Sequence, residues 1–207
     1  RPAAQEPYAR IRIPESYKIG NTYSILVFGL KAEDFEYAYQ MDGPADQARG
    51  LLFNRKHTLL DPYAKAVTGQ RNWGEKPEGG KDFVYKARVV QSDFDWGRYR
   101  NLNYKFEDLV IYEMHVRGFT KDASSGVKGG GTFEGLRQKI PYLKDLGINA
   151  VELMPIFEFD EMESARVVDG VQLYNYWGYN TVSFFAPNTS YAFHQEHNHE
   201  GDELKRL

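Results

Sequence analysis

The chain has 207 residues, of which 42% are apolar and 15% aromatic, and this content is sufficient for a packed core and excludes wholesale disorder. A net charge of −3 argues against a dedicated nucleic-acid-binding protein, which should carry a clustered basic face, so we expect no nucleic-acid partner. The absence of cysteine excludes disulfide frameworks, thiol catalysis and thiolate zinc sites.

No segment has the composition of a membrane-spanning helix. The longest charge-free run, residues 170–193, contains Gln172, Asn175 and Asn180 and is too polar to cross about 30 Å of hydrocarbon. Residues 1–7 are polar and lack the apolar run of a signal peptide. The sequence therefore predicts no membrane partner.

The first half of the chain has the pattern of an antiparallel β-sandwich. Residues 35–41 alternate between large apolar and smaller or polar side chains, which is typical of a half-buried strand. The apolar run 22–30 precedes them, and residues 31–34 are predicted to form a hairpin turn between the two strands. A further strand is predicted over residues 83–90, after a Gly-rich loop at 74–80.

From Leu109 the pattern changes to strand, helix, strand. Residues 109–112 are almost continuously apolar, as in a strand buried on both faces. Apolar residues then recur at helical spacing from Phe133 to Leu143, and residues 148–155 form the second predicted strand. Such a unit implies parallel pairing with a right-handed crossover.

Three residues mark the ends of the predicted helix. Thr132 is placed to cap its first turn. Pro141 should end or kink the helix near Ile140, unless the ring opens a second short turn. Gly147 is a suitable C-terminal stop.

Two clusters have the composition of ligand sites without their spacing. Gly126 and residues 129–131 match neither the dinucleotide-binding nor the P-loop pattern, and predict a flexible loop. His194, His197 and His199 lack the His-Glu-x-x-His spacing and predict a solvated loop in preference to a metal site. We therefore expect no metal and no cofactor.

Polar side chains near the end of the first predicted strand of the second half alternate along the chain as Glu113, His115 and Arg117. At the carboxyl end of a parallel barrel strand, such groups would face an active site. The alternative, which we favour, is that they are buried polar groups that tie the barrel to its neighbour.

Carboxylates gather around the end of the second predicted strand, at Glu152, Glu158, Asp160, Glu161 and Glu163. Glycoside cleavage requires two carboxyl groups about 5 Å or about 6.5–9.5 Å apart, which closeness in sequence does not establish. We expect most of these residues to be loop or surface charges.

Residues 175–180 read Asn-Tyr-Trp-Gly-Tyr-Asn. Aromatic rings match the C–H faces of sugar rings, while Asn and Tyr supply hydrogen bonds. Gly178, between large rings, allows a close backbone approach or a tight turn. A packed aromatic core is the alternative explanation of this cluster, and both remain open.

A series of motifs runs in register through the chain. They occupy residues 35–39, 60–64, 92–96, 112–120, 139–155, 157–161 and 176–181. Together they resemble the isoamylase-type debranching enzymes of the α-amylase superfamily (glycoside hydrolase family 13). The first three are similar to the latter part of that family's starch- or glycogen-binding-type sandwich and its joint, and the others to its first barrel strands.

The resemblance implies a multidomain fold of β plus α/β type. Residues 1–95 would form a partial antiparallel β-sandwich similar to carbohydrate-binding modules, and residues 96–108 a joint. Residues 109–207 would form the start of a (β/α)₈ TIM barrel, which takes about 250 residues when complete. We therefore expect this chain to be a fragment of a longer protein.

The resemblance also implies a function. The parent protein would be a retaining hydrolase that cleaves α-1,6 branch linkages in glycogen or amylopectin. Tyr179 would stack on the glucose next to the scissile bond, with Trp177 and Asn180 beside it. The Asp nucleophile and Glu acid/base would come from later strands, so we expect no catalytic residue and no hydrolytic activity in this chain.

Two other readings stay open. One is a non-catalytic glucan-binding or assembly subunit of the same family, and the other is a pullulanase-like or branching-enzyme-like relative. The expected partner is a branched α-glucan (amylopectin or glycogen), in a protein that could form homo- or hetero-oligomers. A plant or algal source would place the protein in the plastid stroma, and a bacterial source in the cytoplasm.

Overall fold

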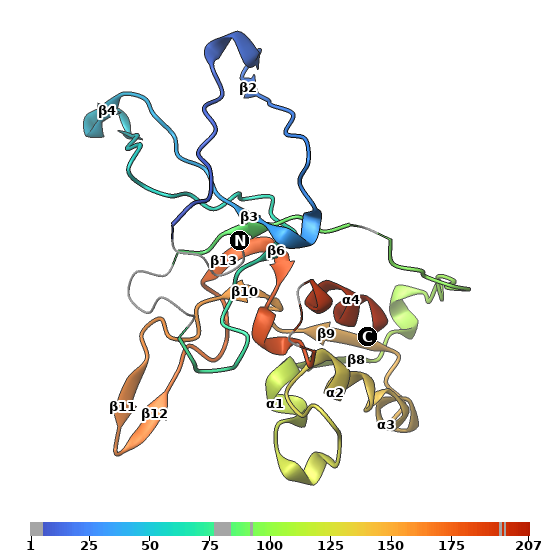
Figure 1. Ribbon diagram of the computed structural model, residues 1–207. Helices are drawn as coiled ribbons and strands as arrows, with labels where there is room; N and C mark the ends of the chain where they lie inside the picture. The colour runs from blue at the N-terminus through green and yellow to red at the C-terminus, as the bar shows by residue number, and fades with distance from the viewer. Residues whose placement is uncertain (1–5, 77–83, 92, 195, 197) are drawn as a thin grey trace.

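The computed structural model describes residues 6–76, 84–91, 93–194, 196 and 198–207 as small β-sheets with short helices (Figure 1). The strands are β1 (Lys18–Ile19), β2 (Thr22–Tyr23), β3 (Glu36–Tyr37), β4 (Ala45–Asp46), β5 (Leu51–Leu52), β6 (Ala66–Val67), β7 (Ala87–Arg88), β8 (Ile111–Met114), β9 (Ala150–Leu153), β10 (Phe157–Phe159), β11 (Arg166–Val168), β12 (Val171–Leu173) and β13 (Thr181–Pro187). The α-helices are α1 (Val116–Thr120), α2 (Phe133–Arg137), α3 (Ile140–Asp145) and α4 (His199–Arg206). The 3₁₀ helices are η1 (Glu15–Tyr17), η2 (Ala32–Asp34), η3 (Gln47–Arg49), η5 (Phe106–Asp108), η6 (Ala123–Ser125) and η7 (Thr189–Tyr191).

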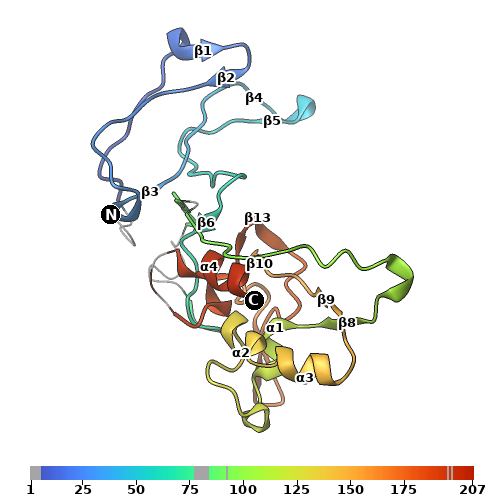
Figure 2. The same ribbon diagram turned by 90° about the vertical axis from the view of Figure 1, so that its right-hand side faces the viewer.

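The N-terminal strands pair differently from the prediction. β1 pairs with β2 and β4 with β5, and both hairpins lie away from the α-helices (Figures 1 and 2). The predicted hairpin between residues 22–30 and 35–41 is wrong, because β3 pairs with β7 and η2 replaces the turn. Leu26 and Phe28, in the apolar run that was expected to pair with β3, are largely exposed. β3 is instead anchored to downstream residues, because the Tyr37 hydroxyl donates to Asp61 (2.6 Å).

A small three-stranded sheet has the order β3–β7–β6, and all of its pairs are antiparallel. The strand predicted over residues 83–90 is reduced to β7, and Phe83 lies outside the described residues, as do residues 77–80 of the preceding loop and Ser92. Ala87 of β7 packs with Ala64, Val67 and Ala186 in a fully buried cluster. Since Ala186 belongs to β13, this cluster joins the two halves of the chain.

A buried ion pair makes a second connection between the halves. Arg88 of β7 donates to the carboxylate of Glu200 in α4, and both side chains are almost completely buried. The helix α4 was not predicted, because residues 194–199 were expected to form a solvated loop. Among the described residues, no helix combines the length and apolar character that crossing a bilayer requires.

The predicted strand–helix–strand unit is confirmed. β8 and β9 pair in parallel, from Ile111 opposite Ala150 to Met114 opposite Leu153. The Thr132 hydroxyl accepts the N–H of Gly135 (3.2 Å) and caps α2, as predicted. Pro141 lies in the first turn of α3 and so opens a second short helix, and Gly147 follows that helix at a φ of 90°.

Burial of the first strand on both faces is not confirmed. Val110 and Ile111 are each 50% exposed, because in the described part of the chain β8 pairs with β9 alone and the helices cover one face. That covered face forms the main core, in which Met114 packs with α2, α3 and β10. The fully buried members of this core are Met114, Val116, Phe133, Leu136, Leu143, Phe159 and Tyr191.

Candidate functional site

The aromatic cluster at residues 175–180 links β12 to β13, and the structure divides it into a packed part and an exposed part. Tyr176 is half-buried, whereas Trp177 is 54% and Tyr179 is 70% exposed. Both explanations of the motif therefore hold in part: Tyr176 packs on the core, and Trp177 and Tyr179 are exposed at the surface. We call Trp177, Tyr179 and Asn180 the aromatic platform.

Gly178 holds the backbone of the aromatic platform against the core. Its φ is 76°, and a Cβ atom at this position would lie 2.6 Å from Cε1 of Phe159. Phe159 is fully buried in β10, so it has no room to move away. The close backbone approach predicted from the sequence is confirmed, and it explains why the residue between the two exposed rings is glycine.

His115 packs against two rings of this segment, Tyr176 and Trp177. Its ring stacks on that of Tyr176, with centroids 4.0 Å apart and planes 9° apart, and its Nε2 lies 2.8 Å from the Tyr176 carbonyl oxygen. The N–H of Gly118 donates to Nδ1 (3.1 Å), which makes His115 the N-cap of α1. Burial is the main cause that lowers the pKa of His115, with Arg117 adding to it and the contact with Tyr176 opposing it.

The prediction that Glu113, His115 and Arg117 alternate along one strand is wrong. β8 ends at Met114, because the His115 side chain caps a helix that starts at the next residue. Glu113 is exposed and lies opposite Glu152 of β9. Only His115 reaches the platform.

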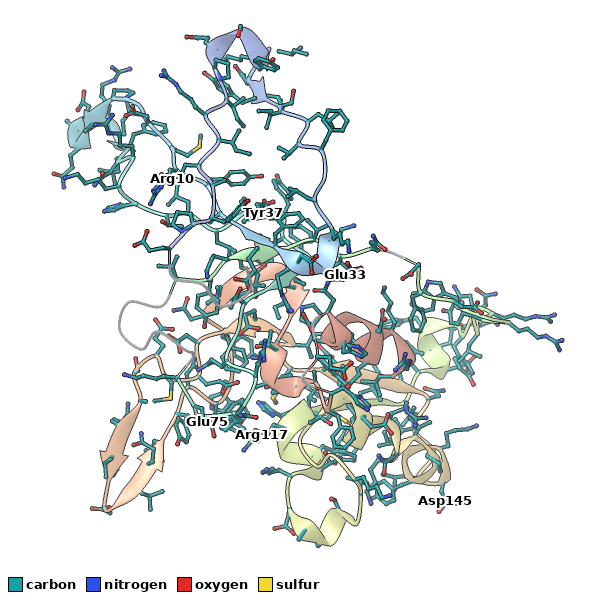
Figure 3. All side chains as sticks on the ribbon, viewed as in Figure 1. Arg10, Glu33, Tyr37, Glu75, Arg117 and Asp145 are labelled. Carbon is teal, nitrogen blue, oxygen red and sulfur yellow. The ribbon has the colours of Figure 1, made fainter. Side chains whose placement is uncertain are left out.

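Arg117 faces the loop that contains Trp73. Its guanidinium lies 4.4 Å from the centroid of the Trp73 ring, which stacks on Tyr191 at 6.1 Å and 4°. Figure 3 labels Arg117 and, in the loop beside it, Glu75. Burial lowers the pKa of Arg117 from its ordinary value, and the nearby Glu161 carboxylate opposes this shift. The side chain thus ties α1 to the loop, which agrees with the favoured structural reading of Arg117.

The expectation of surface carboxylates is wrong for Glu158 and Glu161, which are completely buried. Glu158 accepts the N–H of Thr189 (2.7 Å), whereas Glu161 accepts the N–H of Gly74 (2.8 Å) and the Ser190 hydroxyl. Burial raises the pKa of Glu158 to about 8 and that of Glu161 to about 7. Donors from distant segments allow these groups to be buried, so no pattern in the neighbouring sequence could have revealed them.

The other three carboxylates are more accessible. Glu152 and Glu163 are exposed, and Asp160 is half-buried and accepts the N–H of Met162 (2.8 Å). The side-chain amide of Asn180 donates to both carboxylate oxygens of Glu163, each at 2.7 Å. Glu163 therefore belongs beside the aromatic platform, a relationship that the sequence reading missed.

Residues 129–131 of the glycine-rich loop are packed, while Gly126 is exposed, and the flexibility of the loop stays a prediction. The N–H of Gly131 donates to the Thr120 hydroxyl (2.8 Å). A Cβ atom on Gly130 would lie 2.6 Å from the Thr120 carbonyl oxygen. The glycines thus let the loop lie against α1, and this close packing accounts for them without a phosphate ligand.

Two histidines of the predicted cluster, His194 and His199, lie side by side, with ring centroids 6.1 Å apart. His194 pairs with Glu203 (2.8 Å) and His199, the first residue of α4, with Glu196 (3.1 Å), while His197 lies outside the described residues. The described part of the chain contains no group of three or more His, Cys, Asp or Glu residues that could hold a metal ion.

No protein-family model matches the chain, but curated proteins do. The chain is 44% identical to isoamylase 3, chloroplastic, of Oryza sativa subsp. japonica over 179 residues, which are 84% of this chain and 23% of the relative. It is 37% identical to isoamylase 1, chloroplastic, of Arabidopsis thaliana over 193 residues, 91% of this chain and 24% of the relative. A glycogen debranching enzyme of Yersinia enterocolitica is 34% identical over 203 residues, 90% of this chain and 29% of the relative.

Solved structures of pullulanases resemble the described fold. A pullulanase from Anoxybacillus sp. LM18-11 complexed with maltotetraose superposes with a TM-score of 0.53 at 29% identity, over 72% of this chain and 21% of that one. Type I pullulanase from Bacillus subtilis complexed with maltose gives a TM-score of 0.54 at 26% identity, over 74% and 21%.

The chain spans about a quarter of the length of the curated isoamylases that it matches. The matches cover more than four-fifths of its own residues, and their names agree with the resemblance predicted from the motifs. The chain is thus a homologue of the isoamylase-type glycogen and starch debranching enzymes of the α-amylase superfamily.

Proposed function

We propose that this chain supplies part of the glucan-binding site of a retaining hydrolase that cleaves α-1,6 branch linkages in glycogen or amylopectin. Tyr179, Trp177 and Asn180 would bind the sugar. The observation that carries this assignment is the exposure of the Trp177 and Tyr179 rings on a backbone that Gly178 packs against the core. A sugar ring can stack on large aromatic side chains that are exposed and rigidly held.

The chemistry of the aromatic platform suits a neutral polyol. Ring faces pack against C–H groups, and such contacts contribute on the order of 1 kcal/mol each beyond simple burial. The side-chain amide of Asn180 is oriented by its hydrogen bonds to Glu163. Each carboxylate oxygen of Glu163 has a further lone pair that can accept a hydrogen bond from a sugar hydroxyl. The rings would thus stack on the C–H faces of a pyranose, while Asn180 and Glu163 would form hydrogen bonds with its hydroxyl groups.

We assign no nucleophile and no acid/base to the described residues. Glu158 and Glu161 have the raised pKa values that catalytic acids often show. Both are nevertheless completely buried and hydrogen-bonded to η7, so a polymeric substrate cannot reach them. We therefore expect the chain to bind glucan and not to cleave it.

The domain organisation is also a proposal. Residues 1–95 would belong to a glucan-binding-module-like β-sandwich, and residues 109–207 to a (β/α)₈ barrel whose first unit runs from β8 to β9. Residues 96–108 would be the joint. The antiparallel sheet β3–β7–β6 supports the first assignment, and the parallel pairing of β8 and β9 supports the second. The names of the plant relatives include "chloroplastic", and for a plant or algal source we propose the plastid stroma.

Affinity electrophoresis in amylopectin gels tests the proposed function. We expect the chain to be retarded, and Tyr179→Ala to lower its association constant about fivefold, equivalent to about 1 kcal/mol. Tyr142→Ala is the matched control, because Tyr142 is also 53% exposed but lies on α3. No retardation of the unmodified chain, or equal retardation of Tyr179→Ala, would contradict the assignment. Release of reducing ends by the chain would contradict the expected lack of cleavage.

A further inference from the structure

We infer that His115 is a positioning residue of the aromatic platform. In its neutral form, with the proton on Nε2, it holds the Tyr176 backbone and thereby fixes the exposed rings that follow. His115 is only 7% exposed, so it acts through Tyr176 and not by touching the sugar. The inference rests on the proposed glucan-binding function and adds to it a residue that presents the rings.

The hydrogen bonds of His115 define its tautomer. The backbone N–H of Gly118 can only donate, so Nδ1, which lies 3.1 Å away, must be an unprotonated acceptor. A neutral imidazole then carries its proton on Nε2 and donates to the Tyr176 carbonyl oxygen at 2.8 Å. The Tyr191 hydroxyl lies 3.2 Å from the same nitrogen. A doubly protonated ring would direct one N–H at another N–H and break the contact with Gly118.

Contacts on both sides of Trp177 locate its ring. On one side, Tyr176 stacks on His115, and the Trp177 ring lies edge-on to His115 at 6.2 Å and 81°. On the other side, Gly178 is packed against Phe159. The segment is therefore pinned at residues 176 and 178, and the exposed rings at 177 and 179 extend from fixed backbone. Preorganised rings lose less conformational freedom when a ligand binds.

The two nitrogens of His115 have separable roles. Nδ1 caps α1, and Nε2 holds Tyr176. An asparagine side chain is short and places an acceptor near the Nδ1 position, so His115→Asn keeps the cap and loses the contact with Tyr176. A glutamine side chain is longer and places a donor near the Nε2 position, so His115→Gln keeps that contact and loses the cap. The pair distinguishes positioning from simple helix capping.

Nuclear magnetic resonance of the ligand-free chain tests the positioning itself. The ¹⁵N shifts of the imidazole should show a neutral Nε2–H tautomer at pH 7. His115→Asn should move the indole N–H signal of Trp177, while Trp96, which lies in the joint and packs on Phe94 and Tyr99, serves as the internal control. An Nδ1–H tautomer, or an unmoved Trp177 signal in a folded His115→Asn chain, would overturn the inference.

Amylopectin affinity electrophoresis tests the consequence for binding. We expect His115→Asn to weaken binding about fivefold, close to the loss from removing a ring, and His115→Gln to restore most of it. In thermal unfolding we expect the opposite order. The Tm of His115→Asn should lie closer to that of the unmodified chain than the Tm of His115→Gln does, because asparagine keeps the helix cap. If His115→Asn binds normally and His115→Gln binds weakly, His115 is only a helix cap and the inference fails.

Failure of the proposed function would look different. If the unmodified chain does not bind amylopectin, the proposed glucan-binding function fails. The tautomer of His115 and the indole signal of Trp177 would still test whether His115 positions the segment. If both variants unfold, the tautomer of the unmodified chain alone decides, because an Nδ1–H form is incompatible with the contacts described above.

Discussion

Gly178 lies so close to the Phe159 ring that no other residue fits between the rings of Trp177 and Tyr179 without moving the core. A Cβ atom would approach Cε1 of Phe159 to 2.6 Å and Cδ1 to 2.7 Å. Phe159 is fully buried and packs edge-on against Trp73 and Tyr191. The backbone of the aromatic platform and the main core are therefore one packed unit.

Gly178→Ala should lower the free energy of unfolding by about 3 kcal/mol, since it combines a strained φ with overpacking. Gly170→Ala is the matched control, because Gly170 has a φ of 78° but nothing within 4 Å of its added Cβ. We expect that control to cost only the strain, about 1 kcal/mol. Urea denaturation of the two variants measures the difference, and equal losses would show that the contact with Phe159 carries no energetic weight.

Thr132→Ala should destabilise the chain by about 1 kcal/mol, because the N–H of Gly135 loses its acceptor at the start of α2. Thr132→Ser keeps the hydroxyl and should remain within a few tenths of a kcal/mol of the unmodified chain. Thermal unfolding of both variants checks this expectation. A large loss in Thr132→Ser would instead assign the effect to the missing methyl group.

The buried carboxyl groups make stability depend on pH. Folding raises the pKa of Glu161 to about 7 and that of Glu158 to about 8, from the ordinary value of 4.5. Between pH 4.5 and the raised pKa of each group, the folded chain binds more protons than the unfolded chain. The free energy of unfolding therefore falls as pH rises through this range, and the stabilisation by these two protons is lost above pH 8.

Glu161→Gln should reduce that fall, because glutamine carries no titrating proton in either state. Urea denaturation at pH 5, 6, 7 and 8 measures the slope in both chains. His115 acts in the opposite direction, since its pKa is lowered on folding and its contribution is lost below the ordinary value of 6.5. An unchanged slope in Glu161→Gln would show that Glu161 does not titrate in this range.

Glu163→Ala should weaken amylopectin binding about twofold to threefold, because the Asn180 amide loses the partner that orients it. Stability should be nearly unaffected, as expected for an exposed polar contact. Glu152→Ala, which removes another exposed carboxylate, located on β9, controls for the change in net charge. Equal affinities of the two variants would remove Glu163 from the site.

Local signals in the sequence predicted the second half of the fold well. Thr132, Pro141 and Gly147 each act within one helical turn of their own position, so their effects can be read without knowing the rest of the fold. The pairing of β3 could not be read in this way. Its partner β7 lies some fifty residues away, and the nearer run at residues 22–30 has equal apolar character.

The candidate site was predictable only in part. The residues of the aromatic platform stood out through composition and resemblance, but a Tyr-Trp-Gly-Tyr run does not say which rings are exposed. Tyr176 is drawn inward by His115, which lies 61 residues earlier in the chain. Glu158 and Glu161 were misread because their donors, Thr189 and Ser190, lie about thirty residues later.

The buried pair of Arg88 and Glu200 has a consequence for the order of events during synthesis. The two residues are 112 positions apart, and β7 is the central strand of its sheet. When β3, β6 and β7 have been translated, Glu200, one of the groups that Arg88 contacts in the folded chain, has not yet been made. Ala186 of β13, which packs on Ala87 of β7, is also still to come, so the sheet around β7 should reach its final packing only after β13 and α4 emerge.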